Sequence, residues 1–190
     1  MFRENSKRDA TKKFAEIPHL FAEVKQPKTN FILIPRHSSE NRKYIPMGFF
    51  DENFIASDAN LIIPDAELYH FGILESSVHM IWTKTFCGRL ESRYRYSKDI
   101  VYNNFIWCEP TEKNIKKISA TAQKILDCRK NYPNSSLADL YDPILMPKDL
   151  RDAHKKNDFA VMEAYGFDKN FSESEIVAEL MKLYQNLTEK

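Results

Sequence analysis

A change in the spacing of apolar residues near Pro110 most constrains the fold of this chain. Before Pro110, the apolar runs Asn30 to Pro35 and Asn60 to Pro64 are short and end in proline, which is typical of buried strands. After Pro110, apolar residues recur every three or four positions, as in amphipathic helices. We therefore expect an α+β protein, with a mixed α/β domain over residues 1–109 and a small helical C-terminal domain over residues 110–190.

Two longer segments of the front part show less regular patterns. Phe71 to Trp82 has apolar residues that can share one helical face, although Gly72 and the β-branched residues weaken the helix. Arg89 to Trp107 is rich in β-branched and aromatic residues and predicts extended backbone.

Three helices are expected in the rest of the chain. Thr111 can cap the first of them, which should end before Tyr132-Pro133. The second should run from about Lys148 to Tyr165, with Gly166 as its C-terminal cap. Ser172 and Glu175 form a capping box for the third, which has this apolar stripe: Ile176, Leu180, Leu183, Tyr184 and Leu187.

The glycines exclude a nucleotide-dependent enzyme that is complete within these residues. They are few and far apart: Gly48, Gly72, Gly88 and Gly166. Loops that bind nucleotide phosphates cluster glycines within about six residues, because the backbone must approach the phosphate closely. We therefore expect no Walker loop, no dinucleotide fingerprint and no glycine-rich S-adenosylmethionine loop here.

The cysteines and the apolar runs bear on the compartment. Cys87, Cys108 and Cys128 include no close pair, which disfavours a zinc site and a secreted disulfide framework. No apolar run approaches the roughly 18 residues of a membrane span, and the N-terminus lacks the apolar region of a signal peptide. A reducing, cytoplasmic setting without membrane contact is therefore the expectation.

We find no catalytic constellation. A restriction-type nuclease core needs Pro-Asp followed by an acidic-x-Lys triplet, but Glu23-Val24-Lys25 precedes Pro64-Asp65. Asn103-Asn104-Phe105 is similar to the base-holding loop of amino-methyltransferases but lacks its prolines. The five histidines include no close pair, so we expect structural roles for them and no metal site.

Charge is distributed unevenly, although 28 Lys and Arg nearly balance 27 Asp and Glu. Basic residues concentrate in two islands, Arg36 to Tyr44 and Lys84 to Lys98, where hydroxyl, amide and aromatic side chains accompany them. Such a mixture can mark a nucleic-acid-binding face. The alternative interpretation is that both islands are solvated surface loops.

The second island has a further pattern. If Arg89 to Arg95 is one strand, alternate residues would project from the same face: Arg89, Glu91, Arg93 and Arg95. In a DNA major groove, Arg pairs bidentately with guanine and a carboxylate accepts from the cytosine amino group. Glu91 and Arg93 could therefore read one C·G pair. The alternative is a cross-strand ladder of ion pairs on an exposed sheet.

Several segments resemble one known family. Ser38 to Phe49, Tyr69 to Trp82 and Cys87 to Phe105 are similar to the target-recognition region of MmeI-like, type IIL restriction-modification enzymes. Tyr132 to Pro143 resembles the C-terminal segment that follows this region. A departure is Phe105 to Cys108, where prolines are expected on either side of the tryptophan.

The resemblance implies a function and a larger parent protein. Residues 1–109 would be a DNA target-recognition domain and residues 110–190 a helical C-terminal domain, together the C-terminal fragment of a single large polypeptide. Nuclease and S-adenosylmethionine-dependent adenine-N6 methyltransferase domains would lie upstream as its partners. The fragment would hold no cofactor, and S-adenosylmethionine and Mg would bind in the parent.

The resemblance also assigns residues. In the family, the acidic-x-basic pair that matches Glu91 and Arg93 reads a base pair of the target. Other residues expected to contact double-stranded DNA are Arg36, Ser38, Ser39, Arg42, Lys43, Arg89, Arg95, Lys98 and Asn103. Two alternatives stay open, a protein-interaction module and a free-standing specificity subunit of a restriction-modification system.

Overall fold

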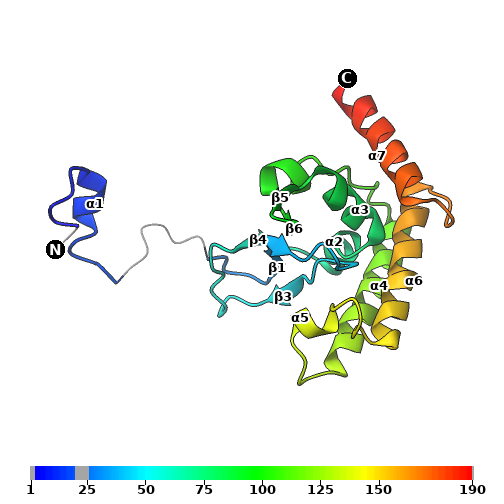
Figure 1. Ribbon diagram of the computed structural model, residues 1–190, viewed down its shortest axis with the longest axis horizontal. Helices are drawn as coiled ribbons and strands as arrows, with labels where there is room; N and C mark the ends of the chain where they lie inside the picture. The colour runs from blue at the N-terminus through cyan, green and yellow to red at the C-terminus, as the bar shows by residue number, and fades with distance from the viewer. Residues whose placement is uncertain (1–2, 20–25, 190) are drawn as a thin grey trace.

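The computed structural model describes residues 3–19 and 26–189, so the Glu23-Val24-Lys25 triplet lies outside the described residues. Helix α1 (Asp9–Lys13) stands apart from the main body (Figure 1). The body contains, in order, β1 (Phe31–Pro35), β2 (His37–Ser38), β3 (Gly48–Phe50), β4 (Asn60–Pro64), α2 (Leu68–Leu74), α3 (Ser77–Phe86), β5 (Gly88–Leu90), β6 (Arg93–Arg95), the π-helical turn η1 (Lys98–Tyr102), α4 (Glu112–Lys130), α5 (Leu137–Leu140), α6 (Lys148–Tyr165) and α7 (Glu173–Thr188).

Two small antiparallel sheets and a set of helices make up the body, which confirms the α+β expectation. One sheet has the strand order β3-β1-β4, and the other has the order β2-β6-β5. The central strand β1 is the most buried, with Phe31, Ile32 and Ile34 almost fully inside. The strands expected at residues 30–35 and 60–64 are confirmed as β1 and β4. No helix in the described ranges is long and apolar enough to cross a membrane.

The segment expected as one helix over Phe71 to Trp82 forms two helices. Chain direction changes after Leu74, and the Ser76 hydroxyl caps the start of α3 by accepting a hydrogen bond from the His79 amide. Gly72 lies where α2 meets α4, and a Cβ added there would come within 2.5 Å of the Ile118 Cγ2 atom. The glycine that weakens the helix pattern therefore permits close packing of two helices.

The expectation of extended backbone from Arg89 to Trp107 is wrong for much of that segment. The chain makes a hairpin, β5–β6, and then the helical turn η1. The Ser97 hydroxyl accepts from the Ile100 amide at the start of η1, and the Trp82 indole donates to the Val101 carbonyl. These bonds satisfy polar groups of a turn that propensity alone would make extended.

The helices expected in the C-terminal part are confirmed. Thr111 caps α4, Gly166 ends α6 with a positive φ of 74°, and Ser172 forms the capping box of α7 with Glu175. Helices α4 and α6 lie side by side along one edge of the body (Figure 1). They pack against α2, so buried side chains from both sides of Pro110 share one hydrophobic core. The domain division at Pro110 stays a prediction.

A buried polar network also joins the two parts. Arg129 of α4 donates from Nη2 to Glu75 Oε1 at 2.8 Å and from Nη1 to the Met47 carbonyl at 2.6 Å. The Met47 amide donates to the same Glu75 oxygen at 2.8 Å. On α6, Asp158 accepts from the Tyr44 hydroxyl at 2.7 Å. Because buried polar groups must be paired, these bonds fix how the front part and the helices fit together.

Candidate functional site

A three-stranded sheet brings the two basic islands of the sequence together. Strand β2 belongs to the first island and pairs with β6 of the second, in the register His37 to Arg95 and Ser38 to Tyr94. The Tyr96 amide extends this pairing by donating to the Arg36 carbonyl at 2.7 Å. We call the sheet formed by β2, β5 and β6 the hairpin sheet.

The hairpin sheet has one exposed and one packed face. Strands β5 and β6 are joined by the two residues Glu91 and Ser92. The residues that face each other across the two strands are Leu90 and Arg93, Arg89 and Tyr94, and Gly88 and Arg95. Cross-strand partners point to the same side of a sheet. One side, here called the outer face, therefore carries four exposed side chains: His37, Leu90, Arg93 and Arg95. Ser38 and Tyr94 are buried on the other side.

The expected single row of Arg89, Glu91, Arg93 and Arg95 is wrong. The turn reverses the chain after Leu90, so Arg93 and Arg95 share a face with Leu90 and not with Arg89. Glu91 lies in the turn itself, with a positive φ of 57°. The row was inferred from alternation along one strand, and alternation does not continue through a two-residue turn.

Glu91 and Arg93 are nevertheless in contact. Arg93 donates from Nη2 to Glu91 Oε2 at 2.8 Å, and the two side chains are 56% and 73% exposed, respectively. An exposed ion pair of this kind contributes at most about 1 kcal/mol to stability. A non-glycine residue at positive φ costs on the order of 1 kcal/mol or more. The turn therefore gains little stability from the residue that occupies it.

Arg89 lies on the inner side and is engaged by the protein itself. Its guanidinium donates to the carbonyls of Ser92 and Lys84, each at 3.2 Å. It also lies 4.3 Å from the centre of the Tyr94 ring. These contacts tie the hairpin turn to the end of α3.

A buried histidine anchors the hairpin sheet to α3. The Tyr96 hydroxyl lies 3.0 Å from His79 Nε2, and His79 Nδ1 lies 3.0 Å from the Leu74 carbonyl. Burial lowers the pKa of His79 to about 4, against a smaller opposing effect of the Leu74 carbonyl. The ring is therefore neutral near pH 7, with Nδ1–H donating to Leu74 and Nε2 accepting from Tyr96. This agrees with the structural role expected for the histidines.

An open hollow of about 810 Å³ adjoins the outer face. Arg36, Arg95 and Lys98 bring positive charge to it, and Asp58 and Asp99 bring negative charge. Lys98 Nζ lies 3.6 Å from Asp99 and stays largely exposed. The hollow therefore brings together basic side chains from both islands.

Other residues expected on the DNA face have internal partners. Ser38 is only 3% exposed, and its hydroxyl accepts from Arg42 Nη1 at 3.5 Å. Arg42 also donates to the Ala138 carbonyl at 3.4 Å, which links this loop to α5. Ser39 accepts from the Asn41 amide at 3.3 Å, whereas Lys43 is exposed. Asn103 is exposed at the end of η1, and its amide donates to Asp99 at 3.5 Å. DNA contact by these residues stays a prediction.

Three residues of this surface were not singled out from the sequence. His37 and Leu90 reach the outer face through strand pairing, which no local pattern indicates. Glu40 lies next to the hairpin turn, where hydrogen bonds from its own backbone and from Ser92 lower its pKa, and Arg93 adds to this effect. The position of Glu40 inside the first basic island is the sequence feature that could have indicated it.

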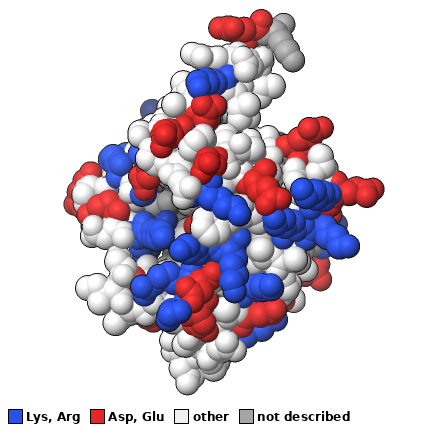
Figure 2. Space-filling model, turned by 90° about the vertical axis from the view of Figure 1, so that its right-hand side faces the viewer, with Lys and Arg blue, Asp and Glu red and all other residues white. Residues whose placement is uncertain are grey.

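The helical side of the molecule has a different character. Figure 2 shows Lys and Arg side chains across the middle of this side, with Asp and Glu among them. Both Lys113 and Lys117 pair with Glu163, and Lys148 pairs with Asp152 at 2.6 Å. Charges of both signs are therefore mixed here, unlike the cluster of arginines on the outer face.

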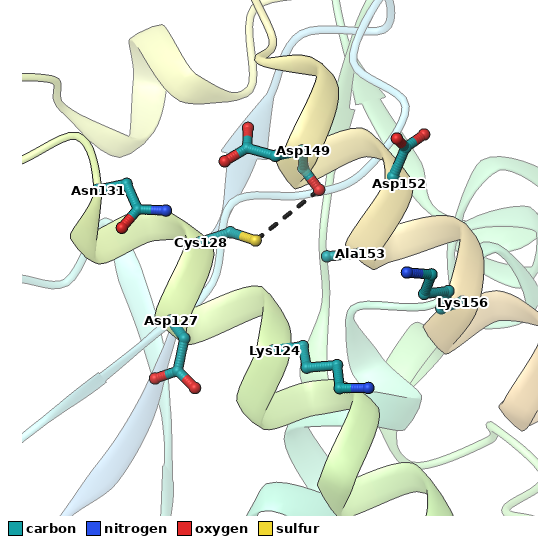
Figure 3. A pocket seen from close by; sticks show the side chains of 8 residues that line it. All are labelled: Lys124, Asp127, Cys128, Asn131, Asp149, Asp152, Ala153 and Lys156. Atoms are coloured by element: carbon teal, nitrogen blue, oxygen red, sulfur yellow. Dashed lines mark hydrogen bonds between the residues drawn. The ribbon is translucent and has the colours of Figure 1, made fainter.

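A second hollow, of about 450 Å³, lies between α4 and α6 (Figure 3). Cys128 points into it and donates from Sγ to the Asp149 carbonyl at 3.8 Å. Burial, Asp149 and Asp127 raise the pKa of the Cys128 thiol, so it is a weak nucleophile near neutral pH. Within residues 3–19 and 26–189, no group of three or more His, Cys, Asp or Glu could hold a metal ion.

Known proteins resemble the chain over its whole length. Residues 1–109 match the family model described as MmeI, target recognition domain, and residues 110–190 match MmeI, C-terminal domain. DNA methyltransferase A of Bacillus subtilis (strain 168) is 40% identical over 188 residues, which are 99% of this chain and 21% of that protein.

A solved structure agrees with these matches. It is described as the structure of the type IIL restriction-modification enzyme MmeI in complex with DNA, and it is 48% identical with a TM-score of 0.91. That match covers 100% of this chain and 25% of the other, so the chain spans a fifth to a quarter of the length of these relatives. The chain therefore belongs to the MmeI family of type IIL restriction-modification enzymes.

Proposed function

We propose that this chain recognises a specific sequence in double-stranded DNA, as the target-recognition part of a longer restriction-modification enzyme. The observation that carries this proposal is the outer face of the hairpin sheet. It presents Arg93 and Arg95 together, with Glu91 at the tip, on the β5–β6 hairpin, whose strand β6 also pairs with β2. The tip of such a hairpin can enter the major groove of B-DNA, which admits a two-stranded β-ribbon and where the edges of all four base pairs differ.

Glu91 and Arg93 would read one C·G pair. Arg93 can donate two hydrogen bonds to guanine O6 and N7, and Glu91 can accept one from the cytosine amino group. In the free protein the two side chains satisfy each other at 2.8 Å, so neither charge lacks a partner before DNA binds. DNA binding exchanges this exposed ion pair for base contacts, and the pair that is given up is weak.

Phosphate contacts would supply most of the affinity and set the register. The exposed candidates are Arg36, Lys43, Arg95, Lys98 and Asn103, and Ser39 is a half-buried one. Ser38 is buried and would act by positioning Arg42. Arg89 is also exposed, but its guanidinium has partners within the protein, so it would position the turn that carries Glu91.

The parent enzyme would combine adenine-N6 DNA methylation with endonuclease activity and would use S-adenosylmethionine and Mg. Among the described residues no group of three or more His, Cys, Asp or Glu could hold a metal ion, and the four glycines of the chain are scattered. Both cofactors would bind upstream domains of the same polypeptide. The role of this chain would be to position the target adenine for extrusion from the duplex.

A charge exchange tests the proposal. In the full-length enzyme, Glu91→Lys with Arg93→Asp should redirect one position of the methylated site from one C·G orientation to the other, because each base then faces the opposite hydrogen-bonding group. The methylated sites of host DNA, mapped by sequencing, give the readout.

A matched exchange elsewhere gives the control. Asp127→Lys with Lys130→Asp reverses an exposed ion pair of 2.9 Å on α4, away from the hairpin sheet, and should leave the site unchanged. An unchanged site after the Glu91 and Arg93 exchange, in an enzyme that still methylates DNA, would exclude this pair as a reader.

A further inference from the structure

Leu90 is an apolar residue on a surface otherwise suited to polar recognition. It is the last residue of β5, directly before the turn, and it is 47% exposed. Its cross-strand partner is Arg93, and its neighbour in the chain is Glu91. Leu90 therefore shares the outer face with the residues proposed to read a base pair.

Exposure of a leucine is common in proteins and carries no inference by itself. Leu145, in the segment between α5 and α6, is even more exposed at 69%. What distinguishes Leu90 is its place beside two charged side chains at the tip of a short edge strand. Edge strands usually carry charged or polar residues at such positions, which keep them from pairing with other chains.

The major groove of DNA contains a group that an apolar side chain on the outer face could contact. The apolar group that an unmodified base pair presents in this groove is the 5-methyl of thymine. A 5-methylcytosine would present the same group. Cross-strand partners lie about 5 Å apart between Cα atoms, and base pairs stack about 3.4 Å apart. Leu90 would thus lie within about two base pairs of the one that Arg93 contacts.

We propose that Leu90 is a further specificity-determining residue, which contacts the 5-methyl group of a pyrimidine within about two base pairs of the C·G pair read by Glu91 and Arg93. This inference rests on the proposed function and deepens it. One methyl removed from water corresponds to about a fourfold gain in affinity, so the preference should be modest and local.

The test uses the full-length enzyme and a randomised duplex DNA library to select the bound site. Each thymine of the selected duplex is then replaced by uracil, and each cytosine by 5-methylcytosine, one position at a time. We expect one position, within about two base pairs of the one altered by the Glu91 and Arg93 exchange, to bind about fourfold more tightly with the 5-methyl group than without it. The uracil substitutions test a thymine methyl, and the 5-methylcytosine substitutions test a cytosine methyl, so the two sources of the methyl are distinguished.

Variants assign the preference to Leu90. Leu90→Ala should abolish it, Leu90→Met should keep part of it, and Leu145→Ala, which truncates an exposed leucine away from the hairpin sheet, should keep all of it. The proposal is overturned if no position shows a methyl preference, or if the preference persists in Leu90→Ala. A wild-type enzyme that selects no site would overturn the proposed function as well, so the two failures are distinguishable.

Discussion

At the scale of single residues, Glu91 occupies a position of the hairpin turn where another residue would make the turn more stable. Its φ of 57° favours glycine, yet it carries a long charged side chain that is mostly exposed. The one ion pair that it makes with Arg93 does not offset the cost of that backbone conformation. Residues held in such conformations cluster at functional sites, which agrees with base reading by Glu91.

Arg89 illustrates how two residues of the same type in one island can differ in role. All three arginines of the hairpin are exposed, but Arg89 donates to the Ser92 and Lys84 carbonyls and covers the Tyr94 ring, whereas Arg93 and Arg95 project from the outer face. We expect Arg89 to position the turn that carries Glu91, and we expect Lys98, which is exposed beside the hollow, to contact phosphate.

The salt dependence of DNA binding should separate these roles. Lys98→Gln should weaken binding to all sequences and reduce the slope of log K against log salt by about 0.9 per lost phosphate contact. Arg89→Gln should leave that slope unchanged and reduce the ratio of specific to non-specific affinity, because the turn loses its tie to α3. Titration of specific and non-specific duplexes over a range of salt gives both quantities. If Arg89→Gln lowered the slope, Arg89 would be a phosphate contact instead.

At the scale of secondary structure, the hairpin sheet is too small to be stable alone. Its strands have two or three residues each, and isolated hairpins are marginal in water. Its position is fixed through buried side chains, among which Tyr96 with His79 is the most direct link to α3. The position of the outer face therefore depends on a histidine that is buried beneath the sheet and is not part of that face.

The anchor should make stability depend on pH. His79 has a folded-state pKa of about 4, below its ordinary value of 6.5, so the unfolded chain binds the proton first as pH falls. Folding is then opposed progressively from about pH 6.5 down to about pH 4. We expect the stability advantage of the wild type over His79→Gln to shrink by at most about 1.4 kcal/mol per pH unit in this window. Urea unfolding of both proteins between pH 7.5 and 4 measures it.

Comparison with His79→Gln isolates this group from others. Burial also lowers the pKa of His154 and raises those of Glu75 and Asp158, but these groups titrate in both proteins and cancel in the difference. A difference that stayed constant with pH would show that His79 keeps an ordinary pKa in the folded protein.

At the scale of the whole molecule, a buried ion pair joins the recognition part to the helices. The side chain of Glu75 is fully buried and that of Arg129 is 9% exposed, and both also bond to the Met47 backbone. Burial raises the pKa of Glu75, and Arg129 opposes this rise. The orientation of α2 and of the backbone at Met47 relative to α4 therefore depends on partners from both sides of Pro110.

A double-mutant cycle tests this coupling. Arg129→Met or Glu75→Gln alone should cost about 3 to 5 kcal/mol, because each leaves a buried charged group without its partner. The double variant should cost clearly less than the sum of the two. Free energies of unfolding from urea titration measure the cycle.

The exposed pair Lys148 and Asp152 is the control, since Lys148→Met and Asp152→Asn should each change stability by less than about 1 kcal/mol and should be nearly additive. Additive effects of the Glu75 and Arg129 substitutions would mean that the two groups stabilise the fold independently.

Local sequence determined most of the helices and strands of this protein. Thr111, Gly166 and the Ser172 capping box marked helix ends, and proline-bounded apolar runs marked β1 and β4, because caps and hydrophobic periodicity act between residues that are close in the chain. The sequence also indicated Glu91 and Arg93 as a pair, but through alternation along one strand, whereas the structure brings the two side chains together at a turn. The start of a new helix after Ser76 and the turn η1 were not predicted, because side-chain hydrogen bonds at these places override the local conformational propensity.

Only the tertiary structure decided which side chains share a surface. Pairing of β2 with β6 joined two islands, bringing His37 next to Arg95, and the turn at Glu91 placed Leu90 beside Arg93 while it put Arg89 on the opposite face. Ser38 is buried, although the composition of the first basic island suggested that it lies on the surface. The physical reason is that the face of a short strand is set by its register against partners distant in the chain, and a shift of one residue exchanges the two faces.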